Sequence, residues 1–531
     1  MSAFFKRIDE RISVSSDRRG NSVKNVVVSL SVSILTLILS FFNRTVFVRA
    51  LSAEYLGLNG LFSNILSFLA LSELGIGGAF GFALYKPLKD GDTRKLSSLM
   101  AVFRRLYTIV GLTILAVGLL LTPFLSCFFR QMPENIPDIR LFFLLNVAGT
   151  AISYFFSYKR TLMICDQKEF LSTLLFGTFR VLAVAMQMII LLCTGSYFWY
   201  LIAMIGCGFA ENLTAAHIAD MLYPFLSDRH PAPLDPEERV RLKKNTAAIF
   251  LHKLGGTLVF SSDNIIISRF VGLIPMGLYS NYALIISSID AILHKALVSL
   301  TASIGNLMVS SEKEHHRQIF SHVLFLNCWI YGAASVCLIC LIDPFLRVWL
   351  GQEYLLDPSV LILAVVNFYL NGVRKTVLIF KDAAGVFTQD KYKPFIEGIV
   401  NILVSVPLAI RFEIQGVIFG TIFSTLAVAF WYEAFVFFRY SFQQGVGRYL
   451  LVQARFFLLN IALAISCYYL CALIEAGPLC TLLIRIPICL ILPSTFYLIG
   501  FRRSGNLGYL RELKSSLLVK YGVRNASKRR L

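Results

Sequence analysis

The chain has 531 residues, of which 56% are apolar and only 15% are charged, whereas soluble domains carry about 25% charged residues. Fibrous, disordered and disulfide-rich classes are excluded by this composition. A set of ordinary soluble domains is also excluded, because the apolar residues come in blocks of about twenty, the length that a helix needs to cross a ~30 Å hydrocarbon core. The composition therefore predicts a polytopic membrane protein.

Fourteen apolar blocks are long enough to span a bilayer. In chain order they cover residues 26–48, 57–84, 107–129, 140–158, 172–194, 198–222, 246–270, 276–300, 319–342, 359–380, 394–411, 414–437, 456–474 and 479–500. We therefore expect an all-α integral membrane protein with about 14 transmembrane helices.

The positive charges of the chain follow the same alternation. The net charge is +19, from 50 Lys and Arg against 31 Asp and Glu. Most of these cations fall in the terminal segments and in every second loop, which the positive-inside rule assigns to the cytoplasm. Both termini are therefore predicted to be cytoplasmic in a multi-pass membrane protein. The net positive charge is then explained without a nucleic-acid partner. The expected partner surface is the lipid bilayer.

Spans and loops together predict six parts of the chain. They are a basic cytoplasmic N-terminus (1–25), a first lobe of six spans (26–222), a cytoplasmic linker (223–245), a second lobe of six spans (246–440), two further helices (441–500) and a basic cytoplasmic tail (501–531). No loop is long enough to fold as a catalytic domain. This predicts a transporter and not an enzyme.

Three short motifs recur in the same order about 220 residues apart. Residues 60–64 (Gly-Leu-Phe-Ser-Asn) resemble 277–281, residues 123–125 (Pro-Phe-Leu) match 344–346, and residues 166–168 resemble 389–391. Because six spans separate the partners, the two halves would be parallel repeats, which we expect to form a V-shaped central cavity, with two extra C-terminal helices. The alternative is a duplication that serves packing only.

Several motifs resemble a known family. They are residues 56–62 (Leu-Gly-Leu-Asn-Gly-Leu-Phe), 73–77 (Glu-Leu-Gly-Ile-Gly), 84–87 (Leu-Tyr-Lys-Pro), 159–162, 166–168, 263–268 and 277–282. This set resembles bacterial polysaccharide exporters of the Wzx type. These belong to the multidrug/oligosaccharidyl-lipid/polysaccharide (MOP) superfamily, which also holds multidrug-and-toxin extruders and the lipid II flippase.

The resemblance implies a flippase that moves oligosaccharide linked to undecaprenyl pyrophosphate across the membrane by alternating access, for capsule, exopolysaccharide or O-antigen assembly. It implies no cofactor, with H⁺ or Na⁺ as an open choice of coupling ion. A polysaccharide polymerase and glycosyltransferases would be partners. Two alternatives stay open, namely a multidrug or organic cation antiporter of the same superfamily and a membrane glycosyltransferase or polymerase.

Cations inside the predicted spans are candidates for a phosphate-binding cavity. A charge at the bilayer centre costs about 2.5–3.5 kcal/mol, so it persists mainly where it pairs, lines a wet cavity or has a function. A pyrophosphate group needs cationic contacts, and the guanidinium fork fits phosphate well. The candidates are Arg44, Arg180, Arg269, Lys295 and Arg374. For Arg44 and Arg374, snorkelling of the side chain to lipid headgroups is the alternative.

Acidic and neighbouring polar residues in the spans are candidates for coupling to an ion gradient. They are Glu73, Asp263, Asn264, Asp290 and His294. Asp290 and His294 are four residues apart and share a helical face, so they would form a proton-sensitive pair or a buried satisfied pair. Asp263 would serve either an ion or a structural pairing. Gly75, Gly77 and Gly78 follow Glu73 and are hinge candidates, with close helix packing as the alternative.

No metal site is expected. The eleven cysteines lie within or at the ends of apolar blocks, as small apolar residues do. The Cys-x-x-Cys of Cys337 and Cys340 has no evident partner pair in the sequence, and the seven histidines show no ligand spacing.

Overall fold

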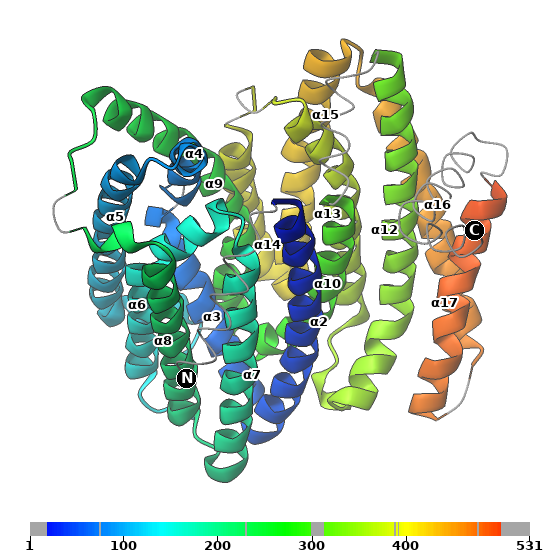
Figure 1. Cartoon of the computed structure of the whole chain (residues 1–531). Coiled ribbons are helices and arrows are strands. Elements are labelled where there is room, and N and C mark those ends of the chain that lie inside the picture. Colours follow the sequence, from blue (N-terminus) through cyan, green and yellow to red (C-terminus); the bar gives the residue numbers. More distant parts are fainter. Residues whose placement is uncertain are drawn as a thin grey trace, which may run out of the picture. The chain divides into compact units, whose positions relative to one another are not determined.

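The computed structural model (Figure 1) describes residues 18–73, 76–228, 231–298, 313–386, 389–390, 392–474 and 477–500. In these ranges the regular structure is helical throughout, and no strand occurs. The predicted all-α membrane class is therefore confirmed. The basic tail (501–531) and the first 17 residues lie outside the described residues.

The chain divides into two compact units, Met1–Gly277 and Leu278–Leu531. The helices of the first unit are α2 (Arg18–Ala50), α3 (Ala53–Leu69), η1 (Ala70–Glu73), α4 (Ile76–Asp90), α5 (Thr93–Leu121), η2 (Thr122–Phe128), α6 (Ile139–Cys165), α7 (Glu169–Thr194), α8 (Tyr197–Leu222), η3 (Pro224–Ser227), α9 (Pro236–Ile266), η4 (Ile267–Val271) and the start of α10 (Leu273–Val298).

The second unit holds the rest of α10, followed by α12 (Lys313–Trp349), η5 (Gln352–Tyr354), α13 (Pro358–Ala383), α14 (Lys393–Ser424), η6 (Thr425–Phe430), α15 (Trp431–Phe437), η7 (Phe438–Phe442), α16 (Gly447–Ala472) and α17 (Pro478–Gly500). The sequence places the second lobe from residue 246 onward, whereas the compact units divide at Gly277. The difference arises because α9 packs against α3 and α4 of the first unit. The V-shaped cavity stays a prediction.

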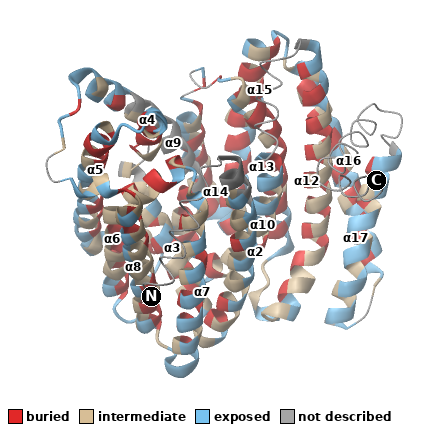
Figure 2. Cartoon of the chain, in the orientation of Figure 1, coloured by how far each residue is buried: buried red, intermediate tan, exposed pale blue. Residues whose placement is uncertain are grey.

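Eleven helices of the described chain are long and apolar enough to cross a membrane. Their exposed side chains are apolar as well, and Figure 2 shows mostly exposed residues along α17, where Leu483, Ile491 and Ile499 point outward. An apolar exterior of this extent fits lipid and not water. The span predicted at 246–270 coincides with the end of α9 and with η4.

The span predicted at 57–84 is a broken helix. Its described residues form α3, the short 3-10 helix η1 and α4, so the α-helix gives way to a 3-10 turn at Ala70–Glu73, and the hinge candidate Gly75 lies outside the described residues. The other hinge candidates, Gly77 and Gly78, are in the first turn of α4. An ideal Cβ at Gly77 would lie 3.1 Å from the Tyr107 hydroxyl. Gly77 therefore leaves room for a close neighbour, and the hinge role of these glycines stays a prediction.

The spans predicted at 394–411 and 414–437 join through a tight turn. The helical backbone conformation is interrupted at Glu413, which has φ +52° and ψ −131°. Gly416 makes the turn possible, because a Cβ there would lie 2.1 Å from the Leu408 carbonyl oxygen. The polar residues Arg411 and Glu413 between two apolar blocks are the sequence signal for this turn.

Two glycines let α3 and the start of α10 cross backbone to backbone. An ideal Cβ at Gly57 would lie 2.1 Å from the Leu273 carbonyl oxygen, and one at Gly277 would lie 2.0 Å from the Ala53 carbonyl oxygen. Ala53 and Gly57 have the spacing of small residues at close helix crossings. Gly277 belongs to one repeated motif, and Gly57 lies just before the other. The crossing therefore joins the two related segments.

The Gly57→Ala and Gly277→Ala substitutions are each expected to destabilise the protein by about 1–3 kcal/mol, because the new methyl group displaces a backbone carbonyl. Thermal unfolding of the purified protein in detergent measures this. Gly206→Ala on α8 is the matched control, since nothing lies within 4 Å of its ideal Cβ. Equal unfolding midpoints for the three variants would contradict this description of the crossing.

Candidate functional site

A buried polar cluster joins α2, α7 and α8 of the first unit. The amide Nδ2 of Asn43 donates to Gln187 Oε1 at 3.3 Å and contacts the Tyr200 hydroxyl at 3.1 Å. The α2 helix packs along α7, and α7 packs along α8, so that these three side chains face one another. Arg44 and Arg180 both interact electrostatically with the Tyr200 hydroxyl. Two of the predicted cationic residues are therefore brought to one place.

Arg180 lies near the middle of its helix. It is the twelfth of the 26 residues of α7, about 16 Å from the start of the helix. It shares a face with Gln187, seven residues later, and its side chain is only partly exposed. No ion pair or hydrogen bond joins Arg180 to another residue in the part of the chain that the structure describes. A guanidinium at this depth without a carboxylate is suited to an anionic ligand.

A second group of cations lines a cavity of about 800 Å³ at one end of α5 in the first unit. Arg104 and Arg105 are exposed at this cavity, beside Tyr158 and the turn that includes η3. An adjoining cavity of about 460 Å³ shares Arg104 and Tyr158 and adds Lys159. The Lys159 ammonium pairs with Asp220 at 2.6 Å, whereas within the described ranges Arg104 and Arg105 form no ion pair. This end of the unit therefore offers two available guanidinium groups beside a cavity.

Sequence reasoning missed this cavity because it counted Arg104, Arg105 and Lys159 only as orientation charges. The topology predicted from those charges places this end of α5 at the cytoplasmic face. A signal that could have found the cavity is the pair of adjacent arginines one turn before the apolar part of α5, next to a segment that carries a further lysine.

The Asp166 carboxylate anchors the same end of the first unit. It accepts a hydrogen bond from the Tyr223 hydroxyl at 2.7 Å and pairs with Lys168 at 2.8 Å. Burial and then the nearby Asp166 charge raise the pKa of the Tyr223 hydroxyl, so Tyr223 stays a neutral donor. The repeated motif at 166–168 therefore fixes the turn between α6 and α7 to the end of α8.

Glu73 is the last residue of η1, which follows α3. Its Oε1 accepts a hydrogen bond from the Tyr107 hydroxyl at 2.8 Å, and Tyr154 also donates to it. Tyrosine hydroxyls satisfy a carboxylate without neutralising its charge. Glu73 therefore keeps an acidic group at the point where the α-helix has given way to a 3-10 turn.

Arg374 is enclosed by carboxylates in the second unit. Its Nε and Nη2 atoms donate to Glu433 at 3.1 and 2.9 Å, and its Nη1 lies 3.6 Å from Glu397 Oε1. Lys393 pairs with Glu433 at 2.6 Å and with Glu397 at 3.1 Å. All four side chains are buried, with at most 8% of their surface exposed.

This network is neutral, with two cations and two carboxylates on α13, α14 and α15. All three guanidinium nitrogens of Arg374 have protein partners, because Nη1 also donates to Asn371 at 3.0 Å. The expectation that Arg374 offers its guanidinium to a phosphate therefore does not fit this structure. Snorkelling of the Arg374 side chain to lipid headgroups, the alternative, does not fit either, since the side chain points into the helix bundle of the second unit. Arg374 is a structural residue here.

Asp290 has a cation partner that the sequence analysis did not assign. Lys375 donates to both its carboxylate oxygens, at 2.6 and 2.8 Å. The Tyr331 hydroxyl contacts Asp290 at 3.0 Å. His294 is exposed on the same helix and interacts electrostatically with Asp290 and Lys375. The expected Asp290 and His294 pair is thus part of a four-residue group that stays partly accessible.

The remaining candidates occupy helix ends or exposed positions. Arg269 is exposed on η4 and donates to the Phe129 carbonyl at 2.8 Å, so it ties η4 to the end of η2. Lys295 is exposed on α10. Asp263 and Asn264 are half-buried near the end of α9. Arg269 therefore stabilises a loop contact and is not brought together with Arg44 or Arg180.

No family model matches the chain, and no curated protein matches it by sequence. Solved structures do match it. The lipid II flippase MurJ, in an inward closed conformation, has a TM-score of 0.65 at 14% identity, over 90% of this chain and 99% of that chain. An inward-facing multidrug resistance MATE family transporter of the MOP superfamily has a TM-score of 0.57 at 14% identity, over 76% and 94%.

A mutant of the Vibrio cholerae MATE transporter VcmN has a TM-score of 0.53 at 12% identity, over 81% of this chain and 99% of that chain. At these identities the likeness establishes the fold. The chain is a multi-pass membrane protein with the helical fold that these solved structures share.

Proposed function

We propose that the protein is a flippase for oligosaccharides linked to undecaprenyl pyrophosphate in the bacterial cytoplasmic membrane. The observation that carries the proposal is the set of guanidinium groups of the first unit that have no carboxylate partner among the described residues. Arg180 lies at mid-helix, and Arg104 and Arg105 line the cavity at one end of α5. A pyrophosphate group is at least a dianion and is bound best by such groups.

The proposed mechanism is alternating access. The two arginines at the inner cavity collect the pyrophosphate from the cytoplasmic leaflet. Farther along the route, Arg180 and then Arg44 bind the pyrophosphate beside the Tyr200 hydroxyl. Each contact compensates part of the cost of moving an anion past apolar surroundings. The polyprenyl chain stays in lipid throughout, so that only the headgroup needs a polar route.

The ion gradient that drives this cycle is H⁺ or Na⁺ in the proposal. Glu73 and the group of Asp290, His294 and Lys375 support it, because both contain titratable side chains that stay partly accessible. Asp263 and Asn264 remain further candidates for this role.

A multidrug cation antiporter shares the fold but would need acidic groups open to a cationic substrate. The carboxylates described above are engaged instead. Glu73 accepts from tyrosines, Asp290 pairs with Lys375, and Glu433 pairs with Arg374. The excess of available cations in the first unit favours an anionic substrate. In the proposal, a polymerase and glycosyltransferases supply and consume this substrate.

Reconstitution into proteoliposomes tests the proposal. A fluorescent oligosaccharide on undecaprenyl pyrophosphate is placed in both leaflets, and an impermeant quencher follows its exposure under a proton or a sodium gradient. We expect headgroup transfer well above that of protein-free vesicles. Absence of transfer under every gradient, with protein that is folded and correctly inserted, would overturn the proposal.

A further inference from the structure

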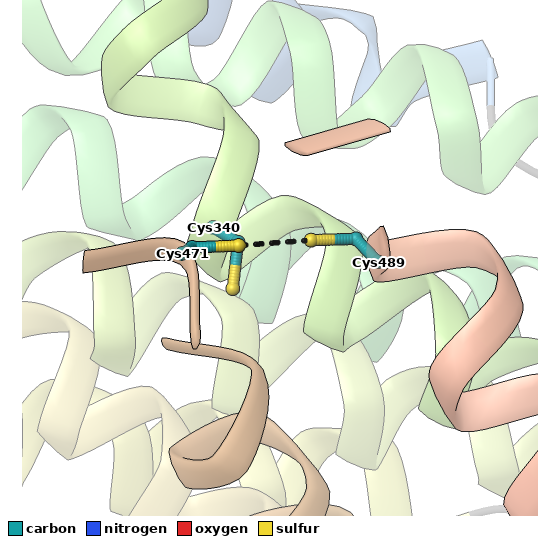
Figure 3. Close-up of side chains that lie close together, drawn as sticks. All are labelled: Cys340, Cys471 and Cys489. Atoms are coloured by element: carbon teal, nitrogen blue, oxygen red, sulfur yellow. Dashed lines mark hydrogen bonds between the residues drawn. The ribbon is translucent and has the colours of Figure 1, made fainter. Parts of the chain in front are cut away.

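Five cysteines of the second unit lie together where α12, α16 and α17 meet. The Sγ atoms of Cys340, Cys471 and Cys489 lie within 4.8 Å of one another, and all three side chains are buried. Figure 3 shows the three side chains close together, with the Cys489 sulfur facing the other two residues across the dashed line. The Cys471 and Cys489 sulfurs are 3.7 Å apart. The Cys-x-x-Cys motif, which has no partner pair of the same spacing in the sequence, therefore lies beside three further cysteines.

The spacing of the residues explains this arrangement. Cys337 and Cys340 are three apart on α12, and Cys467 and Cys471 are four apart on α16, so each pair lies on one helical face. These facing pairs interact electrostatically. Sequence reasoning did not find the second pair because a Cys-x-x-x-Cys in an apolar block looks like ordinary core packing.

A proline fixes the third element. Pro493 in α17 has no N–H group, so the carbonyl of Cys489, four residues earlier, loses its helical donor. The Cys337 thiol donates to that carbonyl, with sulfur and oxygen 3.4 Å apart. Cys467 also hydrogen-bonds with Cys489. Cys489 is thereby held against α12 and α16, with its sulfur beside those of Cys340 and Cys471.

The donor set has the dimensions of a metal–thiolate site. Sulfurs bound at ~2.3 Å around one tetrahedral ion lie ~3.8 Å apart, close to the 3.7 Å between the Cys471 and Cys489 sulfurs. In the described part of the chain, this is the one group of three or more His, Cys, Asp or Glu side chains with such proximity. Its ligands are all sulfur, which selects soft cations.

Positive charge and an entry path lie next to the sulfurs. A cavity of about 360 Å³ is lined by Cys340 and Cys471 together with Arg347 and Arg485. The Arg485 Nε is buried and has no hydrogen-bond partner among the described residues. A cation with three thiolates would carry a net negative charge, which these two arginines would offset.

We propose that Cys340, Cys471 and Cys489 bind a soft thiophilic d¹⁰ cation. The thiols release their protons on binding. Three sulfur ligands favour Cu(I), because structural Zn(II) sites are almost always four-coordinate. Zn(II) would need a fourth ligand, and Cys467, which hydrogen-bonds with Cys489, is the candidate for it. The bound ion would join α16 and α17 to α12, independently of any transported substrate.

The test uses the full-length reduced protein in detergent. Cu(I) is titrated in competition with a chromogenic Cu(I) chelator, and retained copper and zinc are measured by mass spectrometry after desalting. We expect one Cu(I) per chain with a sulfur-only coordination shell by X-ray absorption. Cys340→Ala and Cys489→Ala should weaken binding by more than about 100-fold. Cys471→Ser serves as a further variant if either of these fails to fold.

Cys127→Ala and Cys193→Ala are the matched controls, because both residues are exposed cysteines of the first unit. They should bind as the unchanged protein does. Retention of Zn(II) in place of Cu(I), lost in the same variants, would support the site and assign the ion. No retention of either ion, or equal retention in a variant that lacks all three cysteines, would overturn the proposal.

Discussion

Glu433→Gln is expected to destabilise the second unit by about 3–5 kcal/mol, because it leaves buried cations without their carboxylate. Glu433 accepts from both Arg374 and Lys393 and is only 2% exposed. Removing its charge leaves the four-residue network with a net charge of +1 in an apolar surrounding. The midpoint of thermal unfolding in detergent should fall by about 10 °C.

A double-mutant cycle separates this effect from loss of packing. Arg374→Gln alone leaves an excess negative charge, and the Arg374→Gln/Glu433→Gln protein is neutral again. We therefore expect the double variant to be more stable than the sum of the single effects predicts, by about 0.5–3 kcal/mol. Glu237→Gln is the control, since Glu237 is exposed on α9. Strict additivity would show that the pair is not coupled.

Arg180→Ala and Arg44→Ala are expected to lower transport of a pyrophosphate-linked glycan by about 10–100-fold each. A hydrogen bond to a charged group contributes about 1.5–3 kcal/mol, and each 1.36 kcal/mol changes a rate about tenfold. Initial rates of headgroup transfer in proteoliposomes measure the effect. Arg180→Lys should keep part of the activity, because it retains the charge but not the fork geometry.

Arg49→Ala is the matched control for this pair. Arg49 lies on the same helix as Arg44, is exposed, and occupies the last turn of α2. It should leave the rate unchanged. Unchanged transport in both Arg44→Ala and Arg180→Ala, in protein with normal unfolding behaviour, would remove these residues from the proposed route.

The fold could be predicted because it depends on local properties of the sequence. Apolar blocks of about twenty residues determine the spans. The residues Arg411 and Glu413 mark the turn inside the 394–437 block. The assignment of α9 to the first unit could not be predicted, because it depends on packing against α3 and α4.

The candidate site was predicted only in part, because pairing between distant residues is not visible in one sequence. Lys393 and Glu397 are four apart and could be paired by spacing alone. Their neighbours Arg374 and Glu433 come from two other helices, 59 positions apart. For the same reason Lys375 was not assigned to Asp290, and Cys489 was not assigned to the cysteines of α12 and α16.

One measurement tests most directly whether the available guanidinium groups of the first unit recognise a pyrophosphate. Proteoliposomes from one preparation are offered the same glycan on undecaprenyl pyrophosphate, the same glycan on a polyprenol without phosphate, and an organic cation dye. The account predicts transport of the pyrophosphate form alone, and its loss in an Arg44→Ala/Arg180→Ala protein. Equal transport of the uncharged glycolipid, or transport of the dye in place of the glycan, would contradict it.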